Sequence, residues 1–353
     1  CSRGEHPQCR AAGQEGAALD WQRMPFVCVG RDMLIIAWEL TAACNLSCQY
    51  CRASATHKPD QDELDTDEAI RFVESIAPLK PMLIFSGGEP LLRPDLFTII
   101  RHAVSLGIRV SLASNGTLIT PKLAREIADS GVSRVSISLD GADAAMHDLV
   151  RGQGSFKRSM RGIENLRGLV DFQINFTVSR KSQSELIRIF DLAERLGARA
   201  LHFFFLVPTG RGKEVDVITP ERQEELLLQI NREMDRRNLE VQVTCAPQYA
   251  RLKKPGHGRG SGGCLAGRRF VFVSRKGEVY PCGYLPLRVG SVREKNFIEI
   301  WENSPELQAL REGRLKGKCG RCEFSRSCGG CRARAYALTG DYLQSDPSCR
   351  LEA

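Results

Sequence analysis

The sequence predicts an α/β fold followed by a small, cysteine-rich C-terminal region. Three observations support this. Short apolar runs alternate with amphipathic helical stretches over the first two thirds of the chain, and this alternation repeats six times. After residue 263 the sequence becomes rich in cysteine. Alternation of this kind implies a parallel sheet with helical crossovers. An open six-unit barrel and a doubly wound sheet both fit the pattern.

Each predicted strand is a short run of apolar and β-branched residues, with apolar residues on both faces. This is typical of parallel strands that are covered by helices on both sides. The runs span residues 33–40, 82–87, 109–115, 134–141, 172–178 and 200–207. In both architectures the functional residues lie at the carboxyl ends of the strands.

The helices between these strands carry start and stop signals. Asp65 or Thr66 begins a helix with acidic residues in its first turn. Another helix has Thr120 as its N-cap, Pro121 at its first position and Gly131 beyond its end. Further helices are predicted within 93–107, 155–168, 182–197 and 219–238.

These elements divide the chain into four predicted parts. They are an N-terminal segment that we expect to be poorly ordered (1–30), a barrel core (31–215), a helix and linker (216–260) and a C-terminal domain (261–353). Residues 253–263 are rich in glycine and basic residues, as loops often are. Alternating residues around Lys276-Gly277 predict a hairpin within 268–283.

Overall composition narrows the class of protein. A formal net charge of +8 suits nucleic acid, a membrane surface or a polyanionic small molecule. The sequence has no dense basic stripe of the kind that nucleic-acid-binding proteins carry. The apolar runs are too short to span a bilayer, and no signal segment opens the chain. We therefore expect a cytoplasmic protein without a nucleic-acid or membrane partner.

Fourteen cysteines are unusual for such a chain, and most of them cluster. In a cytosolic protein, clustered cysteines indicate metal binding rather than disulfides. Cys44, Cys48 and Cys51 follow the first predicted strand with C-x3-C-x2-C spacing. Zinc would need a fourth ligand, for which His57 is nearest in sequence. A four-iron cluster on three thiolates would instead leave one iron open to a small chelating molecule.

Short polar motifs follow the next predicted strands. "SGGEP" (86–90) has glycines that expose backbone to a ligand, and "ASNGT" (113–117) and "SISLDG" (136–141) place small polar side chains at strand ends. Because all three motifs lie at the same end of the sheet, they predict one pocket. Arg151 could pair with a carboxylate, but we expect it to be a solvated loop residue.

The cysteine loop, with Tyr50 before its last cysteine, resembles the signature of radical S-adenosylmethionine (SAM) enzymes. The resemblance implies a partial (β/α)6 TIM-type barrel and a [4Fe-4S] cluster on Cys44, Cys48 and Cys51, with SAM on the open iron. It also implies a set of residues for the SAM pocket, in which Glu89 faces the SAM ammonium group. That set is Tyr50, Gly87, Gly88, Glu89, Pro90, Asn115, Ser138 and Asp140.

The C-terminal cysteines resemble the SPASM, or twitch, extension of radical SAM enzymes, which carries one or two auxiliary iron–sulfur clusters. By analogy, one cluster would be held by Cys319, Cys322, Cys328 and Cys349. A second would be held by Cys264, Cys282 and Cys331, with Cys245 as the fourth ligand. The last pair, Cys328-x2-Cys331, departs from the usual x3 spacing, which leaves the partition open. Zinc ribbons compete with this interpretation.

Longer matches at 203–214, 244–252, 263–294 and 316–343 resemble the heme synthases of the siroheme-dependent heme pathway. This resemblance implies oxidative decarboxylation of two propionates of iron-coproporphyrin III to vinyl groups, which gives protoheme. A different modified tetrapyrrole or a peptide is the alternative substrate.

In the implied mechanism the reduced cluster cleaves SAM, and the resulting 5′-deoxyadenosyl radical takes a hydrogen atom from the propionate. Carbon dioxide and one electron then leave, with an auxiliary cluster as a plausible electron acceptor and no catalytic acid or base. The reaction requires a low-potential donor of the ferredoxin or flavodoxin type. Arg211 and Lys213 are candidates for binding propionate, and His202 for ligating heme iron or moving protons.

Overall fold

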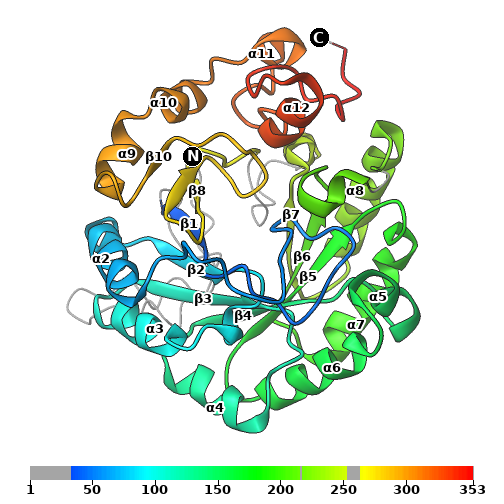
Figure 1. Cartoon of the computed structure of the whole chain (residues 1–353). Coiled ribbons are helices and arrows are strands. Elements are labelled where there is room, and N and C mark those ends of the chain that lie inside the picture. Colours follow the sequence, from blue (N-terminus) through cyan, green and yellow to red (C-terminus); the bar gives the residue numbers. More distant parts are fainter. Residues whose placement is uncertain (1–32, 215–216, 253–262, 353) are drawn as a thin grey trace, which may run out of the picture.

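The computed structural model describes residues 33–214, 217–252 and 263–352. A ten-stranded sheet runs in the order β10-β9-β8-β1-β2-β3-β4-β5-β6-β7, and every pair from β8 through β7 is parallel. The sheet curves inside a ring of helices (Figure 1). The strands are β1 (Ile35–Glu39), β2 (Met82–Ser86), β3 (Arg109–Ser114), β4 (Arg134–Ser138), β5 (Phe172–Val178), β6 (Ala200–Phe205), β7 (Glu240–Thr244), β8 (Phe270–Val273), β9 (Glu278–Tyr280) and β10 (Gly290–Ser291).

All six predicted strands are present, as β1 to β6, and the predicted α/β barrel fold is confirmed. The described helices are α2 (Thr66–Ile76), α3 (Leu96–Ser105), α4 (Pro121–Asp129), α5 (Ala144–Arg151), α6 (Ser155–Leu166), α7 (Leu186–Leu196), α8 (Pro220–Met234), α9 (Phe297–Asn303), α10 (Pro305–Glu312), α11 (Gly317–Arg321) and α12 (Arg332–Thr339). Short 3-10 turns lie at Ala77–Leu79, Pro90–Leu92, Gln183–Glu185, Gly210–Glu214 and Pro247–Arg251. Among the described residues, no helix is long and apolar enough to cross a membrane.

The local signals in the sequence act as expected at the helix ends. Asp65 and Glu68 form a reciprocal capping box at α2, and the Thr120 hydroxyl accepts a hydrogen bond from the backbone N–H of Leu123 at α4. Gly131, just past α4, has a φ of 86°, a conformation that glycine adopts without strain. These contacts satisfy backbone groups that would otherwise lack partners at the helix termini.

Two segments differ from the prediction. Residues 144–151 form helix α5, although the stretch around Arg151 was expected to be a loop; the Asp143 side chain caps this helix by accepting from the backbone N–H of Met146. The predicted linker 216–260 contains strand β7, which pairs in parallel with β6. The predictions for residues 1–30 and most of the 253–263 loop lie outside the described residues.

The predicted hairpin within 268–283 is present as β8 and β9, with Val273 opposite Val279 and Gly277 in the turn. Strand β8 also pairs in parallel with β1, so the C-terminal region begins as an added edge of the barrel sheet. The rest of that region, α9 to α12, continues around the rim of the barrel on the same side as β8 (Figure 1).

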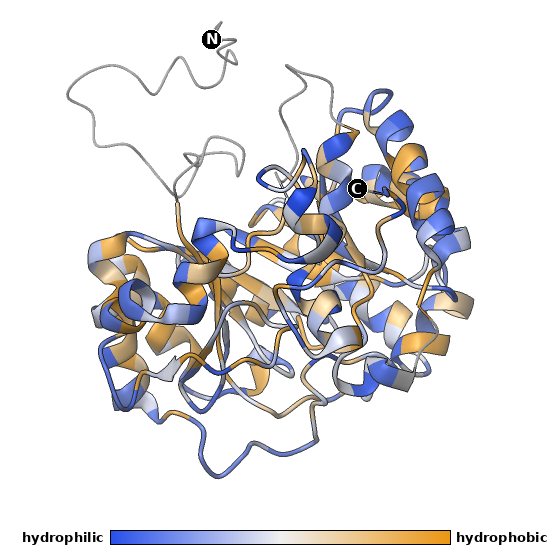
Figure 2. Ribbon diagram, turned by 90° about the horizontal axis from the view of Figure 1, so that it is seen from above, coloured by the Kyte–Doolittle hydropathy of each residue, from blue (hydrophilic) through white to orange (hydrophobic). Residues whose placement is uncertain are grey.

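The core lies between the sheet and the helices. Trp38 on β1 is fully buried and meets Phe72 of α2 edge-on, with ring centroids 5.0 Å apart. A second group of rings lies on the β5 and β6 side, where Phe203 meets Phe176 edge-on and Phe190 at a tilt. Apolar strands are enclosed by helices with many hydrophilic residues (Figure 2). This packing fixes the strand ends, and so fixes the loops that follow them.

Candidate active site

The three cysteines after β1 line one cavity of about 220 Å³ at the carboxyl ends of the strands. Residues that follow or end the neighbouring strands also line it, which confirms that the polar motifs meet in one place. They are Ser86, Gly87, Gly88, Ala113, Ser114, Asn115, Ser138, Asn175, Thr177, Phe204, Leu206, Val207 and Thr209. The barrel side also includes Leu46, Tyr50, Arg52, Ala53 and Arg151, and Tyr284 reaches the cavity from the C-terminal region.

The glycines of "SGGEP" pack directly against the start of the cysteine loop. The backbone N–H of Gly88 donates to the Thr41 carbonyl at 2.7 Å, and that of Glu89 donates to the Ala43 carbonyl at 2.7 Å. A Cβ atom on Gly88 would lie 2.3 Å from the Ala43 carbonyl oxygen. Only glycine permits this approach, so the motif positions the cysteine loop as well as lining the cavity.

We therefore expect Gly88→Ala to displace the cysteine loop and to destabilise the protein by about 1–3 kcal/mol. Gly212→Ala is the matched control, because its Cβ would approach no atom closer than the Tyr50 Cβ at 3.4 Å and the Leu206 Cδ1 at 3.5 Å, which are ordinary contacts. Urea unfolding and iron content after anaerobic reconstitution measure both effects. Equal iron incorporation by Gly88→Ala and Gly212→Ala would contradict the expectation.

Glu89 lies beneath the cavity rather than on its wall. Its side chain is fully buried and accepts hydrogen bonds from the Ser114 hydroxyl at 2.9 Å and the Asn115 backbone N–H at 2.8 Å. Burial raises the Glu89 pKa from 4.5 to about 7, although these hydrogen bonds oppose the shift. In this structure the Glu89 carboxylate holds the end of β3 in place.

The raised pKa predicts a pH dependence of stability. The unfolded carboxyl ionises near 4.5, whereas the folded one retains its proton up to about 7, so stability falls as pH rises through this range. The full shift corresponds to ~3 kcal/mol. Comparing urea unfolding of wild type and Glu89→Gln at pH 4.5 and pH 7.5 isolates this contribution, with exposed Glu164→Gln as control. Parallel changes in all three proteins would contradict it.

Asn115 links the end of β3 to the cysteine loop. Its amide nitrogen donates to the Asn45 side-chain oxygen at 2.9 Å and lies 4.0 Å from the Cys44 sulfur. Asn115 and Ser138 both line the cavity, as do Gly87 and Gly88, whereas Glu89, Pro90 and Asp140 lie outside its wall. The sequence thus predicted the neighbourhood of all these residues, but not which of them face inward.

Arg151 is not the solvated loop residue that we expected. Arg151 is the last residue of helix α5, and its side chain is only 14% exposed. It forms an ion pair with the fully buried Asp140, at 2.5 Å from Nε to Oδ2. Its Nη1 lies 3.9 Å from the Cys48 sulfur. Burial opposes the charge, but Asp140 and Cys48 together raise the Arg151 pKa above its usual value. The cavity therefore has a fixed positive group beside one cysteine.

The other Asp140 oxygen accepts from the backbone N–H of Thr177 at 2.8 Å, so the carboxylate is fully engaged with the protein. Tyr50, directly before Cys51, is buried, and burial together with Asp140 raises its pKa well above the usual value. Tyr50 therefore lies at the cavity wall close to the Asp140 carboxylate.

The three predicted substrate residues do not line the cavity. Arg211 clamps the cysteine loop instead, donating from Nε to the Cys48 carbonyl and from Nη1 to the Ala55 carbonyl, both at 2.8 Å. His202 lies on β6, where its Nδ1 is 3.0 Å from the Gln173 amide nitrogen, and burial lowers its pKa to about 3. Lys213 is exposed on the following turn.

His57 does not complete a metal site with the three cysteines; its Nδ1 is 3.0 Å from the Cys44 carbonyl oxygen. Among the described residues, no three His, Cys, Asp or Glu side chains are arranged to hold a single metal ion. An iron–sulfur cluster holds its thiolates farther apart than one ion does. The absence of a single-ion site among the described residues therefore leaves an iron–sulfur cluster as the group that these cysteine thiols suit.

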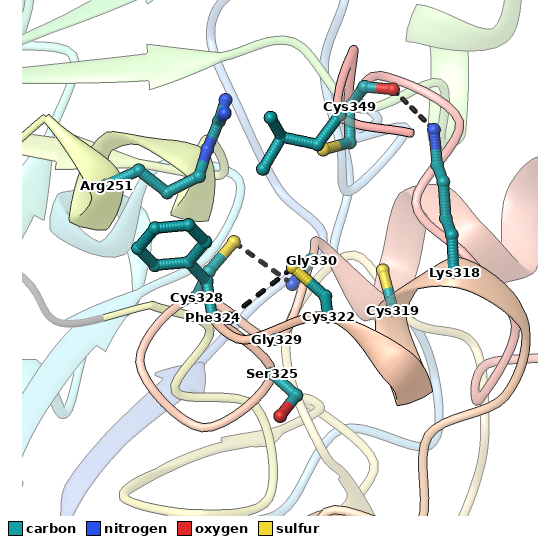
Figure 3. A pocket seen from close by; sticks show the side chains of 11 residues that line it. Arg251, Lys318, Cys319, Cys322, Phe324, Ser325, Cys328, Gly329, Gly330 and Cys349 are labelled. Carbon is teal, nitrogen blue, oxygen red and sulfur yellow. Dashed lines mark hydrogen bonds between the residues drawn. The ribbon is translucent and has the colours of Figure 1, made fainter. Parts of the chain in front are cut away.

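The outer cysteine set comprises Cys319, Cys322, Cys328 and Cys349, which line one small cavity together with Arg251, Lys318 and Phe324 (Figure 3). Backbone N–H groups point at these sulfurs: Phe324 donates to Cys322 at 3.4 Å, Gly330 to Cys328 at 3.5 Å and Asp346 to Cys319 at 3.4 Å. Burial raises the Cys328 pKa to about 12. Donors directed at sulfur are typical of cluster sites.

The inner cysteine set comprises Cys245, Cys264, Cys282 and Cys331. Burial raises the pKa values of Cys245, Cys282 and Cys331, and neighbouring thiols of the set raise them further. Arg334 is buried beside them, donates to the Cys245 carbonyl at 3.1 Å and lies 3.8 Å from the Asp346 carboxylate. Tyr284 lies among these cysteines and also lines the barrel cavity. The inner set therefore adjoins the cavity.

Comparison with known proteins agrees with this geometry. Residues 38–193 match the radical SAM superfamily, and residues 264–331 match the SPASM iron–sulfur cluster-binding domain. The chain is 48% identical to the AdoMet-dependent heme synthase of Methanosarcina barkeri, over 89% of this chain and 95% of the relative. It is 43% identical to that of Nitratidesulfovibrio vulgaris, over 89% and 91%. The chain belongs to the AdoMet-dependent heme synthase family of radical SAM enzymes.

More distant relatives of this heme synthase family member have other names. The mycofactocin maturase MftC of Mycolicibacterium smegmatis is 33% identical over 90% of this chain and 82% of the relative. The pre-heme d1 synthase of Dinoroseobacter shibae is 31% identical over 93% and 89%. Among solved structures, Streptococcus suis SuiB bound to S-adenosylmethionine superposes with a TM-score of 0.73 at 18% identity, covering 90% of this chain and 77% of SuiB. This last likeness concerns the fold alone.

Sequence reasoning missed several residues of this heme synthase family site. Arg151 could have been placed by the pattern "DAAMHDLVR", in which Asp143 caps a short helix whose last residue is basic. Tyr284 follows Cys282 by two residues but gives no signal that it would reach the barrel cavity. Arg334 and Arg52 likewise depend on the fold that brings distant segments together.

Proposed function

We propose that this chain converts iron-coproporphyrin III to protoheme by radical SAM oxidative decarboxylation of two propionates to vinyl groups. The observation that carries the proposal is the near full-length identity of 48% to a relative named as an AdoMet-dependent heme synthase. The cavity between the cysteine loop and the inner cysteine set supports it, because this reaction needs a radical source on one side of the substrate and an electron acceptor on the other.

In this proposal Cys44, Cys48 and Cys51 hold a [4Fe-4S] cluster with SAM, which when bound supplies a 5′-deoxyadenosyl radical. Their sulfurs line one cavity, with Arg151 beside Cys48, and so fit the ligand set of such a cluster. Gly87, Gly88, Asn115 and Ser138 would contact SAM directly. Glu89, Pro90 and Asp140 would act from beneath, since Glu89 orients Ser114 and Asn115, and Asp140 orients Arg151.

We propose two auxiliary clusters, one on the outer and one on the inner cysteine set. The N–H groups directed at the outer sulfurs, and the buried Arg334 beside the inner ones, would stabilise negatively charged thiolate-bound clusters. Each propionate then loses a hydrogen atom to the radical, carbon dioxide and one electron. The inner set, which shares Tyr284 with the cavity, is placed to receive that electron.

Substrate contacts would come from residues at the rim of the cavity. Arg211 is committed to the cysteine loop and His202 to Gln173, so of the three predicted residues only exposed Lys213 has a side chain free to meet a propionate at the cavity rim.

We further propose a low-potential electron donor of the ferredoxin or flavodoxin type. We also propose cytoplasmic location without a nucleic-acid or membrane partner.

The decisive experiment is anaerobic reconstitution with iron and sulfide, followed by incubation with reductant, SAM and iron-coproporphyrin III. The proposal predicts 5′-deoxyadenosine together with a tetrapyrrole that has lost two carbon dioxide molecules and four hydrogen atoms, which is one carbon dioxide and two hydrogens for each propionic acid group converted to vinyl. Formation of 5′-deoxyadenosine with an unchanged tetrapyrrole would mean that the substrate is wrong. If cluster-replete protein forms neither 5′-deoxyadenosine nor a changed tetrapyrrole, the assigned enzyme class is wrong.

A further inference from the structure

Four arginines line a third cavity in the C-terminal region, apart from the cavity at the cysteine loop, here called the SAM cavity, and from the small cavity of the outer cysteine set. This arginine cavity has a volume of about 550 Å³. It is lined by Arg268, Arg269, Arg311, Arg326, Ala250, Leu265 and Ser327. No acidic residue is among them. None of these residues lines the SAM cavity, so the proposed reaction leaves the arginines without a role.

The arginine cavity lies against the backbone of both C-terminal cysteine sets. Ser327 directly precedes Cys328 of the outer set, and Leu265 directly follows Cys264 of the inner set. The two segments are joined by a hydrogen bond from the Cys264 backbone N–H to the Cys328 carbonyl at 2.9 Å. A molecule seated here would therefore approach both proposed redox centres at once.

Positively charged side chains at this cavity are exposed and can contact a partner protein. Arg268 and Arg326 are exposed, and within the described residues neither has a carboxylate partner; Arg268 donates to the Arg326 carbonyl at 3.2 Å. Arg311 is held in place over the Trp301 ring, 4.0 Å from its centroid, while donating to the Gly267 carbonyl. Lys318 adds positive charge beside the outer cysteines (Figure 3). In the loop from Cys319 to Cys331 the single acid, Glu323, lines neither cavity.

At Arg269 the arginine cavity lies beside the amino end of β1, away from the cysteine loop. The Arg269 carbonyl accepts from the backbone N–H of Ile35, the first residue of β1, whereas the cysteine loop follows the last residue of that strand. A partner at the arginine cavity would therefore leave entry to the SAM cavity unobstructed.

We propose that the arginine cavity and its rim are the docking site for an acidic one-electron carrier protein. The inference rests on the proposed function in taking the cysteine sets as redox centres. Each propionate converted to a vinyl group releases one electron, which would pass through the cysteine-held centres to the docked oxidised carrier and reduce it by one electron. A patch of positive charge beside a redox centre favours such an encounter, because complementary charge accelerates association.

The test is binding of oxidised flavodoxin, and separately of ferredoxin, to reconstituted protein by biolayer interferometry at low and moderate salt. Arg268→Glu/Arg326→Glu should raise the Kd for the carrier by about tenfold or more at low salt and reduce the salt dependence of that Kd. The matched control is Lys122→Glu/Arg125→Glu, the same charge change on exposed residues of α4, far from α11 and α12 (Figure 1). The control should bind within about twofold of wild type. Iron content and dithionite-driven SAM cleavage should be the same in all three.

Equal carrier binding by wild type and Arg268→Glu/Arg326→Glu would overturn the docking site, as would equal weakening by the α4 control. Absence of carrier binding to the wild type at low salt would overturn it as well. The proposed function has its own test, which is the dithionite-driven change of the tetrapyrrole in the absence of a carrier protein. If the tetrapyrrole stays unchanged while carrier binding still depends on Arg268 and Arg326, the substrate assignment fails and the docking site is supported.

Discussion

Cys48→Ala is expected to reduce formation of 5′-deoxyadenosine from SAM to the background rate. Cys48 lines the SAM cavity beside Arg151 and is one of only three thiols after β1. With two thiolates left, the loop cannot hold a cluster that keeps a single open iron, and iron content should fall by about four per chain. Iron analysis and liquid chromatography of the SAM cleavage products measure both effects.

Cys322→Ala is the informative control for this loss. Cys322 belongs to the outer set, which shares no lining residue with the SAM cavity. This variant should also lose iron, yet it should still bind SAM, because the cysteine loop and its Gly88 and Arg211 contacts are untouched. Retained SAM cleavage in Cys48→Ala, or lost SAM binding in Cys322→Ala, would show that the two sites have been assigned incorrectly.

The sequence was sufficient for the barrel because its signals are local. Strands buried on both faces, the Asp65 and Thr120 caps and the glycines past the helix ends each determine a short segment, and six repeats then determine the parallel sheet. Two elements of the barrel were not predicted, for physical reasons. Helix α5 is only eight residues long, and β7 alternates polar and apolar residues at the edge of the sheet.

Within the site, position along the strand could be predicted, whereas the direction of a side chain could not. All strand-end motifs meet at the cavity because parallel strands bring their carboxyl ends together. Whether a residue faces the cavity depends on strand register and on its partners. Glu89 turns under β3 to meet Ser114, and Arg211 turns back onto the cysteine loop, so neither could be placed from its neighbours in sequence.

Contacts between the barrel and the C-terminal region were likewise beyond the sequence. Arg52 in the cysteine loop binds Glu39, lies 4.4 Å from the centre of the Phe272 ring and donates to the Gly283 carbonyl. Arg275 of the hairpin pairs with the same Glu39. These contacts tie the cysteine loop to the segment that carries Cys282 and Tyr284. The relative placement of the SAM cavity and the inner cysteine set thus depends on charges more than 200 residues apart in sequence.

Asp140→Asn is expected to destabilise the protein by about 3–5 kcal/mol, because it leaves the buried Arg151 charge without its carboxylate. The Asp140 side chain is fully buried and that of Arg151 is 14% exposed, so water cannot replace the lost partner. Since Arg151 also approaches the Cys48 sulfur, its displacement should lower iron incorporation too. Urea unfolding under anaerobic reducing conditions and iron analysis measure the two consequences.

The double variant Asp140→Asn/Arg151→Met distinguishes a buried ion pair from simple loss of packing. If the cost comes from an unpaired charge, removing both charges should destabilise less than the sum of the two single variants. Arg167→Met is the surface comparison, because Arg167 pairs with Glu164 at 51% and 67% exposure and should cost less than about 1 kcal/mol. Strict additivity at Asp140 and Arg151 would mean that the pair does not act as a unit. In that event the position of Arg151 beside Cys48 would have to depend on helix α5 rather than on Asp140.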